Sequence, residues 1–525
     1  MKNKFTFIDL FSGIGGFKMA LTNNGGNCIN FSEINKDAVN TYCENYNESF
    51  DSNLGDITKI KELPKHDILT AGVPCQSWSI AGKNLGFDDD RGQLWNDTIY
   101  LLKQSQPKAF IFENVKGLVD PRNKESFSYI LDRIKQAGYY AKHYVINSFD
   151  YGVPQNRIRV FIVGFRNKKH LDNFKLPKPN ENRVKLADIL GVKLPKVIDE
   201  NITQKDLFGN PILDRQMSLS SKNGFNDYFL FNDLRNGHTT IHSWDILETT
   251  ERQKEICLLL LKNRRKSQFG KLDGNPLSLI HFKSLDSSIT KKELSKLVDL
   301  NILKEQEYQF KINDFKDSEL TENELELLSK ETSANLILDD LKTHRPFKIK
   351  KISINDTIET LKEKGIVECT EIRYDFKNTK ISSGLFGVNR VFLPTSDVFP
   401  TLVASDTNDY VALENLRTDN HETYKQDFLE KVYFSENYRK ITKEEACVIQ
   451  GFPKDFKLPE SRARWMKLIG NSVSVSVIDM LAKTIVKTGV FDVNKNETER
   501  IKKYEMPTMA IVNKGFSDKN KVQSI

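Results

Sequence analysis

One cysteine lies in a loop whose composition suits covalent chemistry. The loop reads Gly72-Val73-Pro74-Cys75-Gln76-Ser77-Trp78-Ser79 and directly follows a strand-like run. A thiol on a rigid loop near helix N-termini can have a lowered pKa and act as a nucleophile. The alternative is a buried, inert thiol, which we favour for Cys28, Cys43, Cys257, Cys369 and Cys447. The polar flanks favour a nucleophilic Cys75, and Gly82, Gly86 and Gly92 suit the hinges of a mobile lid.

A glycine-rich loop follows the first strand-like run and reads Asp9-Leu10-Phe11-Ser12-Gly13-Ile14-Gly15-Gly16-Phe17. Its spacing is GxGG rather than the dinucleotide fingerprint GxGxxG, so a pyrophosphate is not the expected ligand. Glu33 closes the second run, where an acid commonly accepts hydrogen bonds from ribose hydroxyls, and Asp56 follows at a third loop. Each feature alone could be a tight turn or a solvated acid. Together the three loops favour a cofactor that contains adenosine.

Two further patterns lie at strand ends. In Phe112-Glu113-Asn114-Val115 the carboxyl group of Glu113 could hydrogen-bond a ring nitrogen while Cys75 attacks the ring. Gln155-Asn156-Arg157-Ile158-Arg159 predicts both arginines on one face of a strand, where guanidinium groups suit a phosphate or a pyrimidine carbonyl. An ordinary strand-end acid and a salt-bridged strand edge are the alternatives.

The elements around these motifs alternate between strand and helix over residues 1–166. Strand-like runs occur at Phe5–Leu10, Cys28–Ile34, Asp67–Gly72, Ala109–Val115, Ala141–Ile146 and Val160–Phe165. Amphipathic segments lie between them at Lys36–Tyr46, Gln93–Gln104 and Ser126–Ala137. This rhythm predicts a mostly parallel sheet with helices on both faces, so the loops after the strands should carry the chemistry.

The rest of the chain has a different organisation. Residues 167–383 contain helix-like segments but no clear internal repeat, and Lys291–Lys304 with Glu307–Ile312 is compatible with a winged-helix-like element. Residues 384–490 return to strands and loops and end in a helix over 472–488, with Asn471 or Ser472 as its N-cap. Residues 491–525 form a charged extension.

The composition is that of a soluble protein with more than one domain. With 525 residues, 38% of them hydrophobic and 28% charged, the chain predicts two to four domains. We expect a cytoplasmic protein because no apolar run approaches the roughly 20 residues of a membrane span and no signal-like segment follows Met1. The net charge of +7 agrees with a polyanionic partner. The cysteines show no metal-ligand spacing, so no metal site or disulfide framework is expected.

In their order and wording, the motifs resemble those of the DNA cytosine-5 methyltransferases. The resemblance rests on DLFSGIGGF, Glu33, Asp56, PCQ, ENV, QNRIR, Phe399-Pro400-Thr401-Leu402 and Gly470-Asn471-Ser472-Val473. It covers about 1–166 and 384–488, and it identifies the middle region as the family's target recognition domain. The implied fold class is α/β, with a Rossmann-like, mostly parallel sheet of the S-adenosylmethionine-dependent methyltransferases and a second, large α+β target recognition domain.

The resemblance also implies a cofactor and two pockets. The cofactor would be S-adenosylmethionine, with S-adenosylhomocysteine as the product and no metal. The cofactor pocket would be formed by Asp9, Phe11, Gly13, Gly15, Gly16, Glu33, Ile34, Asp56, Ile57, Pro74, Asn471 and Val473. The pocket for the base would be formed by Cys75, Glu113, Arg157 and Arg159. The lid and DNA contacts would involve Gln76, Ser79, Arg91 and Asn114.

The implied reaction is methylation of cytosine at C5 through a covalent adduct. The Cys75 thiolate would add to C6, which makes C5 nucleophilic toward the sulfonium methyl group, while Glu113 offsets charge on the ring. C5 and C6 are inaccessible in a stacked duplex, so the base must be flipped out. The expected partner is double-stranded DNA with a short recognition sequence, and the expected setting is a bacterial or phage restriction–modification system. We expect a monomer without membrane attachment, and any restriction endonuclease would be encoded separately.

Three other functions are compatible with parts of the pattern. A transfer-RNA cytosine-5 methyltransferase would share the catalytic core, but that branch carries a Cys-Phe-Thr motif, which is absent here. A catalytically silent DNA-binding protein would not need the complete catalytic set. A small-molecule methyltransferase would explain the cofactor loops but not PCQ, ENV and QNRIR together.

Overall fold

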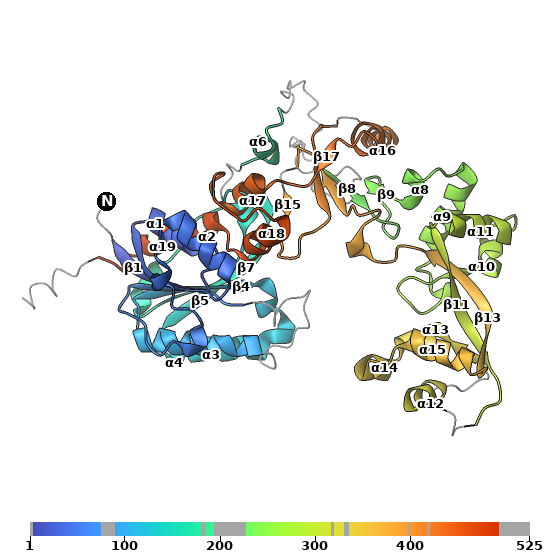
Figure 1. Ribbon diagram of the computed structural model, residues 1–525, viewed down its shortest axis with the longest axis horizontal. Coiled ribbons are helices and arrows are strands. Elements are labelled where there is room, and N and C mark those ends of the chain that lie inside the picture. Colours follow the sequence, from blue (N-terminus) through green and yellow to red (C-terminus); the bar gives the residue numbers. More distant parts are fainter. Residues whose placement is uncertain are drawn as a thin grey trace, which may run out of the picture. The chain divides into compact units, whose positions relative to one another are not determined.

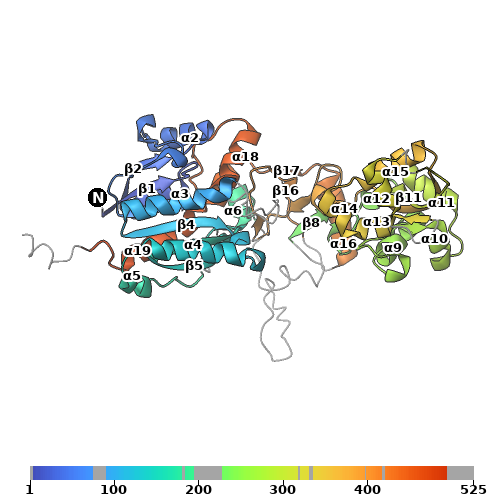
Figure 2. The same ribbon diagram turned by 90° about the horizontal axis from the view of Figure 1, so that it is seen from below.

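The computed structural model describes residues 4–74, 90–179, 184–193, 227–316, 320–329, 335–396, 398–416 and 420–492 (Figures 1 and 2). The chain divides into two compact units. The first unit comprises Met1–Ile146, Ile158–Pro179 and Val473–Ile525, and the second comprises Asn147–Arg157 and Asn180–Ser472. The second unit therefore contains the middle region from Asn180 onward and most of the returning segment, whereas residues 167–179 belong to the first unit. The expected functional boundaries at 166/167, 383/384 and 490/491 stay predictions.

The first unit is built on a six-stranded sheet with the order β2-β1-β3-β4-β7-β5. Its strands are β1 (Phe5–Leu10), β2 (Gly26–Ser32), β3 (Ile68–Gly72), β4 (Ala109–Val115), β5 (Tyr140–Asn147) and β7 (Ile158–Phe165). β1 pairs in parallel with β2 and β3, and β3 with β4, whereas β7 runs antiparallel to β4. The mostly parallel α/β sheet expected from the sequence is confirmed.

Helices cover both faces of this sheet (Figure 1). They are α1 (Gly16–Asn23), α2 (Lys36–Tyr46), α3 (Asp90–Ser105), α4 (Lys124–Gln136), α5 (Lys168–Asn173) and α19 (Val475–Lys487). Short 3-10 turns are η1 (Phe50–Ser52), η2 (Ile57–Lys59), η4 (Lys116–Val119) and η5 (Pro121–Asn123). Figure 1 shows α1, α2 and α19 on one face of the sheet and α3 and α4 on the other. Phe110 and Phe112 of β4 and Trp95 of α3 are fully buried in the core of this unit.

The end of the first unit corrects one detail of the sequence analysis. The expected final helix over 472–488 begins later, because Ser474 rather than Asn471 or Ser472 is its N-cap. Asn471 instead ends a preceding helix, α18 (Arg462–Asn471), which the sequence analysis did not predict. By length and composition, Arg462–Lys487 is the one candidate membrane span in the described part of the chain. Its apolar window is 67% buried, and core helices pass the same test.

The described residues of the second unit form three sheets. A five-stranded sheet has the order β17-β16-β14-β8-β9, a four-stranded sheet has the order β10-β13-β11-β12, and β15 pairs with β6. The strands of the five-stranded sheet are β8 (Tyr228–Phe231), β9 (Thr240–Ile241), β14 (Arg390–Phe392), β16 (Asp409–Ala412) and β17 (Tyr438–Arg439). The other strands are β6 (Gln155–Asn156), β10 (Leu277–Ser278), β11 (Leu303–Ile312), β12 (Asn335–Ile337), β13 (Val367–Phe376) and β15 (Phe399–Pro400).

Helices of the second unit surround these sheets and fall into two groups. Those along the four-stranded sheet are α9 (Glu251–Asn263), α10 (Leu279–Leu285), α11 (Lys291–Asp299), α12 (Glu322–Leu328), α13 (Leu338–Thr343), α14 (Arg345–Lys350) and α15 (Ile354–Glu363). The others are α6 (Leu186–Leu190), α8 (Ser243–Ile246), α16 (His421–Phe428), α17 (Lys443–Gln450) and α18, with the 3-10 turns η6 (Ser148–Tyr151), η7 (Ser267–Phe269) and η9 (Ile381–Ser383). A π-helical segment, η10 (Leu429–Tyr433), continues α16. This mixture agrees with the expected α+β second domain.

Candidate active site

The first unit has its topological switch point between β1 and β3. The chain passes from β1 to β2 on one side, and then crosses to the other side of β1 to form β3 and β4. In open α/β sheets, ligands bind outside the carboxyl ends of the strands at such a point. The sequence motifs lie at these ends: the glycine-rich loop follows β1, Glu33 follows β2, Pro74 follows β3, and Glu113 lies two residues before the end of β4. The fold therefore brings the main motifs of the first unit to one edge of the sheet.

The loop after β1 is held by Glu33. One carboxylate oxygen, Oε2, accepts the Gly13 backbone N–H at 2.9 Å. The other, Oε1, accepts the backbone N–H groups of Ile34 and Asn35 at 2.9 and 2.8 Å. A carboxylate offers about four acceptor positions, so capacity for a ligand hydroxyl remains. Glu33 thus shapes the loop as well as being a candidate ligand.

Gly15 allows the loop to pass close to an aromatic ring. Its φ of 85° lies in the left-handed region, and a Cβ atom there would come within 2.3 Å of the Tyr46 ring. The Tyr46 hydroxyl donates to the Gly15 carbonyl at 2.7 Å. A side chain at position 15 would therefore displace Tyr46 or the loop.

Asp9 and Ser12 carry buried polar atoms at the start of this loop. Thr70 donates its hydroxyl to Asp9 Oδ1 at 2.8 Å. Among the described residues, neither Asp9 Oδ2 nor Ser12 Oγ has a hydrogen-bond partner. Burial raises the pKa of Asp9 to about 7, although the Thr70 hydrogen bond opposes the shift. Unpaired buried polar atoms of this kind are costly without a ligand.

The loops that contain Glu33 and Asp56 lie beside each other. Asn53 accepts the backbone N–H groups of Glu33 and Gly55 through Oδ1, each at 3.0 Å, and thereby joins the two loops. Ile34 is 74% exposed, which leaves its side chain available to a flat ring. Asp56 accepts the Thr58 backbone N–H and hydroxyl, and these bonds lower its pKa. Ile57, in contrast, is buried in the core.

Glu113 and Arg159 contact each other at the carboxyl end of β4. Arg159 Nε lies 3.2 Å from Glu113 Oε1, and both side chains are mostly buried. In the neighbouring strand Gly72 pairs with Glu113, only three residues before Cys75 in sequence. Asn114 donates from Nδ2 to the Val73 carbonyl at 3.2 Å. β4 thus supplies both a carboxyl group and a clamp on the segment that leads to Cys75.

Arg157 has partners within the second unit instead. The predicted strand with both arginines on one face is interrupted at Arg157, between β6 and β7. Its guanidinium group donates to the carbonyls of Leu402, Gly470 and Ser472 at 3.0, 3.1 and 2.7 Å. Because the side chain is buried and bound to backbone, this geometry favours a positioning function for Arg157 over direct contact with a substrate.

Two glutamines that the sequence analysis did not single out complete this arrangement. Gln155 donates to the Ile449 carbonyl at 3.0 Å and to Gln450 Oε1 at 2.9 Å. Gln450 donates in turn to the Ser472 carbonyl at 2.8 Å. Gln155 lies within the QNRIR motif, and Gln450 is the last residue of the expected helix Thr442–Gln450. These two positions are the features of the sequence that could have drawn attention to the glutamines.

Comparison with known proteins gives the family. The profile of the C-5 cytosine-specific DNA methylases matches residues 5–487. The chain belongs to this family. The type II methyltransferase M.HgiBI of Herpetosiphon aurantiacus is 40% identical over 492 residues, which cover 93% of this chain and 98% of that protein. M.NlaIV of Neisseria lactamica is 31% identical, covering 92% of this chain and 99% of that protein.

Likeness to solved structures is weaker than these sequence matches. The Entamoeba histolytica methyltransferase EhMeth aligns with 92% of this chain and 98% of its own, with a TM-score of 0.44 and 14% identity. The assignment therefore rests on the sequence matches. The chain is a DNA cytosine-5 methyltransferase, as the sequence motifs indicated.

Several predicted site residues of this methyltransferase lie outside the described residues. They are Cys75, Gln76 and Ser79, and Arg91 lies on α3 where the backbone alone is described. The other five cysteines are not bonded in disulfides, and burial raises the pKa of Cys28 and Cys447 to about 12. Such thiols are poor nucleophiles at neutral pH. The cysteine chemistry expected of a cytosine-5 methylase is therefore not available at these two positions.

The Gly470-Asn471-Ser472-Val473 motif of the methylase is packed against backbone. A Cβ atom at Gly470 would lie 2.4 Å from the Ala404 backbone nitrogen, which explains the glycine. Asn471 is exposed, whereas Val473 is buried. Among the described residues, no group of His, Cys, Asp and Glu side chains has the arrangement of a metal site.

Proposed function

We propose that this enzyme transfers a methyl group from S-adenosylmethionine to C5 of a cytosine within a specific short sequence of duplex DNA. The observation that carries the proposal is the position of Glu113, which lies beside Arg159 and on the strand adjacent to the one that leads to Cys75. This combination, within a C-5 cytosine-specific DNA methylase, supports covalent catalysis on a pyrimidine ring.

The chain's own residues fit S-adenosylmethionine. The unpaired Asp9 Oδ2 and Ser12 Oγ suit a ligand rich in donor and acceptor groups, and the loop after β1 turns without bulky side chains at Gly13 and Gly15. Glu33 has acceptor capacity for ribose hydroxyls, and the exposed Ile34 suits an adenine ring. The remaining residues proposed for this pocket are Phe11, Gly16, Asp56, Ile57, Pro74, Asn471 and Val473. When bound, S-adenosylmethionine supplies an electrophilic methyl group.

In the proposed reaction Cys75 makes C5 of cytosine nucleophilic by adding to the neighbouring carbon, C6. Its thiolate forms a bond to C6, and the electron pair of the C5–C6 double bond becomes available at C5. After C5 has gained the methyl group, a base removes the C5 proton. The electron pair of that C–H bond restores the C5–C6 double bond, and Cys75 leaves as a thiolate.

Glu113 and Arg159 would stabilise and orient the cytosine ring during these steps. The carboxyl group of Glu113 would hold a proton at N3 of the base and so offset the negative charge that addition to C6 creates. Arg159 keeps the carboxyl group oriented and offers further N–H donors to the base carbonyl. Asn114 would fix the position of the Cys75 loop through the Val73 carbonyl.

The remaining proposals concern DNA and cellular setting. The target cytosine would leave the stack, at a cost of a few kcal/mol, and a lid that includes Gln76, Ser79 and Arg91 would close over it. Similarity to M.HgiBI and M.NlaIV supports a modification enzyme of a type II restriction–modification system in a bacterial cytoplasm. Any restriction endonuclease would be a separate chain, and we propose that the methyltransferase acts as a monomer.

The test is methyl transfer from radiolabelled S-adenosylmethionine to DNA, with bisulfite sequencing of the product. We expect C5 methylation within one short sequence, and none with Cys75→Ser. Cys447→Ser serves as the matched control, because that buried thiol has no place in the proposed chemistry. Labelling of transfer RNA instead of DNA would move the enzyme to the RNA branch. Cofactor binding without transfer to either nucleic acid would indicate a silent scaffold and overturn the proposal.

A further inference from the structure

Thr250–Phe376 contains the same structural pattern twice. The first copy runs α9, β10, α10, α11, β11, and the second runs α12, β12, α13, α14, α15, β13. In both copies the short strand leads directly into the next helix, and three residues separate the last helix from the long strand. The second copy differs by the additional helix α14. The sequence showed no clear internal repeat, but the structure contains one.

Strand register relates the copies by an approximate two-fold axis. When residues of β11 are matched with those 64 positions later in β13, the pair Leu303↔Phe376 becomes Ile312↔Val367, and both pairs occur. The short strands obey the same rule: β10 pairs Leu277 with Tyr374, and β12 pairs Leu336 with Phe310. The sheet order β10-β13-β11-β12 reads as its own reverse when the copies are exchanged.

Local signals repeat along with the register. The first helix of each copy begins with a capping box, Thr250 with Gln253 in α9 and Thr321 with Glu324 in α12. Asn301 and Gly365 occupy the left-handed position after the last helix. Two backbone bonds also correspond, from Lys377 to the Ile302 carbonyl at 2.9 Å and from Asn313 to the Ile366 carbonyl at 2.8 Å. So many matched positions indicate an internal duplication.

Each copy completes the hydrophobic core of the other. The core under α9 and α11 includes Tyr374 and Phe376, which come from the second copy's long strand. The core under α12 and α15 includes Tyr308 and Phe310, which come from the first copy's long strand. Figure 1 shows the helices of the two copies at opposite ends of the β11–β13 ribbon. The copies therefore present separate helical surfaces on one two-stranded ribbon.

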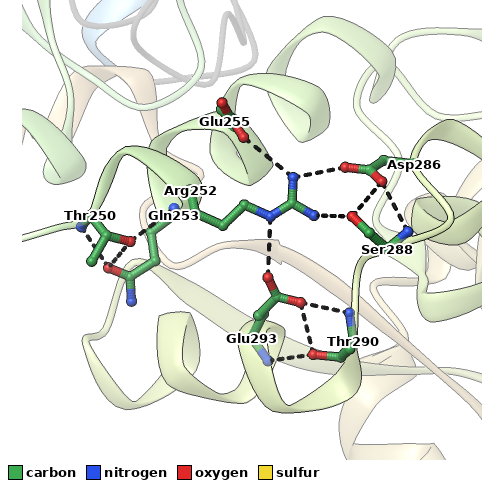
Figure 3. Close-up of polar contacts among 8 residues, drawn as sticks. All are labelled: Thr250, Arg252, Gln253, Glu255, Asp286, Ser288, Thr290 and Glu293. Atoms are coloured by element: carbon green, nitrogen blue, oxygen red, sulfur yellow. Dashed lines mark hydrogen bonds and ion pairs between the residues drawn. The ribbon is translucent and has the colours of Figure 1, made fainter.

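In the first copy α10 and α11 are successive helices joined by a turn at 286–290, which is the element order of a helix-turn-helix. Arg252 of α9 fixes the start of α11, as Figure 3 shows. Its guanidinium group bonds Asp286 at 2.8 Å, Ser288 at 2.7 Å and Glu293 at 3.2 Å. Glu293 accepts the Thr290 backbone N–H at 2.8 Å as part of a capping box. The orientation of α11 is thus set by side chains as well as by its buried Leu294 and Leu297.

The exposed faces of the two last helices carry opposite charge. On α11 the exposed side chains include Lys291, Lys292 and Lys296, and none of the three has an ion-pair partner among the described residues. On α15 the exposed side chains include Asp356, Glu359 and Glu363. The nearby Lys362 and Lys364 are ion-paired, with Glu307 of β11 and Glu324 of α12 respectively. Residues 250–312 contain thirteen Lys and Arg against eight Asp and Glu, whereas 321–376 contain nine against twelve.

We propose that the first copy is a DNA-reading unit and that α11 is its recognition helix, with the second copy as its structural support. The proposal rests on the methylation of duplex DNA proposed above. A helix-turn-helix places its second helix in the major groove, and unpaired lysines on that helix bind phosphates beside the groove. The acidic face of α15 would be repelled by the same backbone, so the duplicated surfaces have different functions.

The test compares two matched pairs of exposed lysines. Lys291→Ala/Lys292→Ala changes the first copy, and Lys348→Ala/Lys350→Ala removes the same number of charges from α14 of the second, where Lys350 is ion-paired with Glu326. Each protein is titrated with a duplex that carries the sequence which bisulfite sequencing identifies as methylated, between about 50 and 200 mM salt. We expect the first variant to bind about tenfold more weakly, with a salt slope lower by about 2, one for each lost phosphate contact. The second should bind within about twofold of the wild type.

Two outcomes would overturn the inference while leaving the enzyme's function intact. One is wild-type affinity and salt slope for Lys291→Ala/Lys292→Ala, and the other is an equal loss for both variants. Methylation by the wild type is measured on the same duplex, so a failure of the proposed function is visible separately as no product. Arg252→Ala adds an independent readout, because it frees the start of α11 without removing a lysine, and it should weaken binding with little change in salt slope.

Discussion

Glu113 and Arg159 lie diagonally across β4 and β7 and form an ion pair between Arg159 Nε and Glu113 Oε1. Glu113 is directly opposite Phe161, two residues along β7 from Arg159. Residues two apart on a strand share a face, so both side chains project from the same side of the sheet. The carboxyl group is therefore oriented by its own sheet before any substrate arrives.

Replacing Glu113 with Gln should separate its chemistry from its structure. Gln keeps the shape and an acceptor for Arg159 but cannot exchange a proton with the ring. We expect kcat to fall by roughly 10²–10⁴, the usual contribution of a general acid or base, with a small change in the KM for DNA. Single-turnover methylation assays measure this. Wild-type kcat in Glu113→Gln would exclude proton transfer by this residue.

Asp9 should make stability depend on pH. Its pKa rises from 3.8 to about 7 on folding because the side chain is buried. The folded protein then holds a proton that the unfolded chain releases, so the free energy of unfolding falls as pH rises from about 4 to 7 and changes little above that. Asp9→Asn should remove this dependence and stabilise the free protein at pH 8 by a few kcal/mol. Urea unfolding at pH 5 and pH 8 measures both effects. The same change in the free energy of unfolding between the two pH values in the wild type and in Asp9→Asn would contradict the expectation.

Arg157 should be needed for stability of the second unit. Removing its guanidinium group leaves the carbonyls of Leu402, Gly470 and Ser472 without this donor. We expect Arg157→Ala to cost about 3 kcal/mol, since each hydrogen bond to a charged group contributes about 1.5–3 kcal/mol but such losses do not simply add. Arg157→Lys should rescue little because an ammonium group lacks the planar fork. Thermal unfolding measures the loss, with the exposed Arg166→Ala as control.

Phe376 offers a test of the exchanged cores. It belongs to the second copy but is buried under α9 and α11 of the first. Phe376→Ala should cost about 3–5 kcal/mol and lower hydrogen-exchange protection first in α9 and α11. Phe310→Ala should do the same first in α12 and α15, because Phe310 is buried there. Loss of protection confined to each residue's own copy would show that the cores are not exchanged.

Local patterning was enough to predict much of the catalytic fold. The run Phe5–Leu10 and the run Ala109–Val115 are strands with those bounds, since both are short, mostly apolar and rich in Phe and Ile. The motif loops followed from the rule that parallel strands direct their carboxyl ends to one edge. Cys75 lies outside the described residues, so its function stays a prediction supported by the family.

Long-range pairing could not be predicted in the same way. Arg157 and Arg159 alternate as if on one strand, but the carbonyls that bind Arg157 come from residues more than 240 positions away. The duplication was hidden because its copies share buried positions such as Leu297 and Leu361 rather than surface charge, and α14 shifts their spacing. The two-fold relation between the copies depends on the register of β11 with β13, which only the paired strands of the structure reveal.

The exchange of strands between the copies has a consequence for synthesis of the chain. β10 pairs with β13 alone in the described sheet, and β11 is flanked by β12 and β13. When a ribosome has released residues up to Ile312, neither β12 nor β13 has yet been made, and β10 and β11 both lack the partner strands that they have in the folded sheet. The nascent first copy therefore has open strand edges, which favour aggregation, until Phe376 emerges. Speed of translation through the second copy, and chaperones that cover such edges, should decide how much enzyme reaches the folded state.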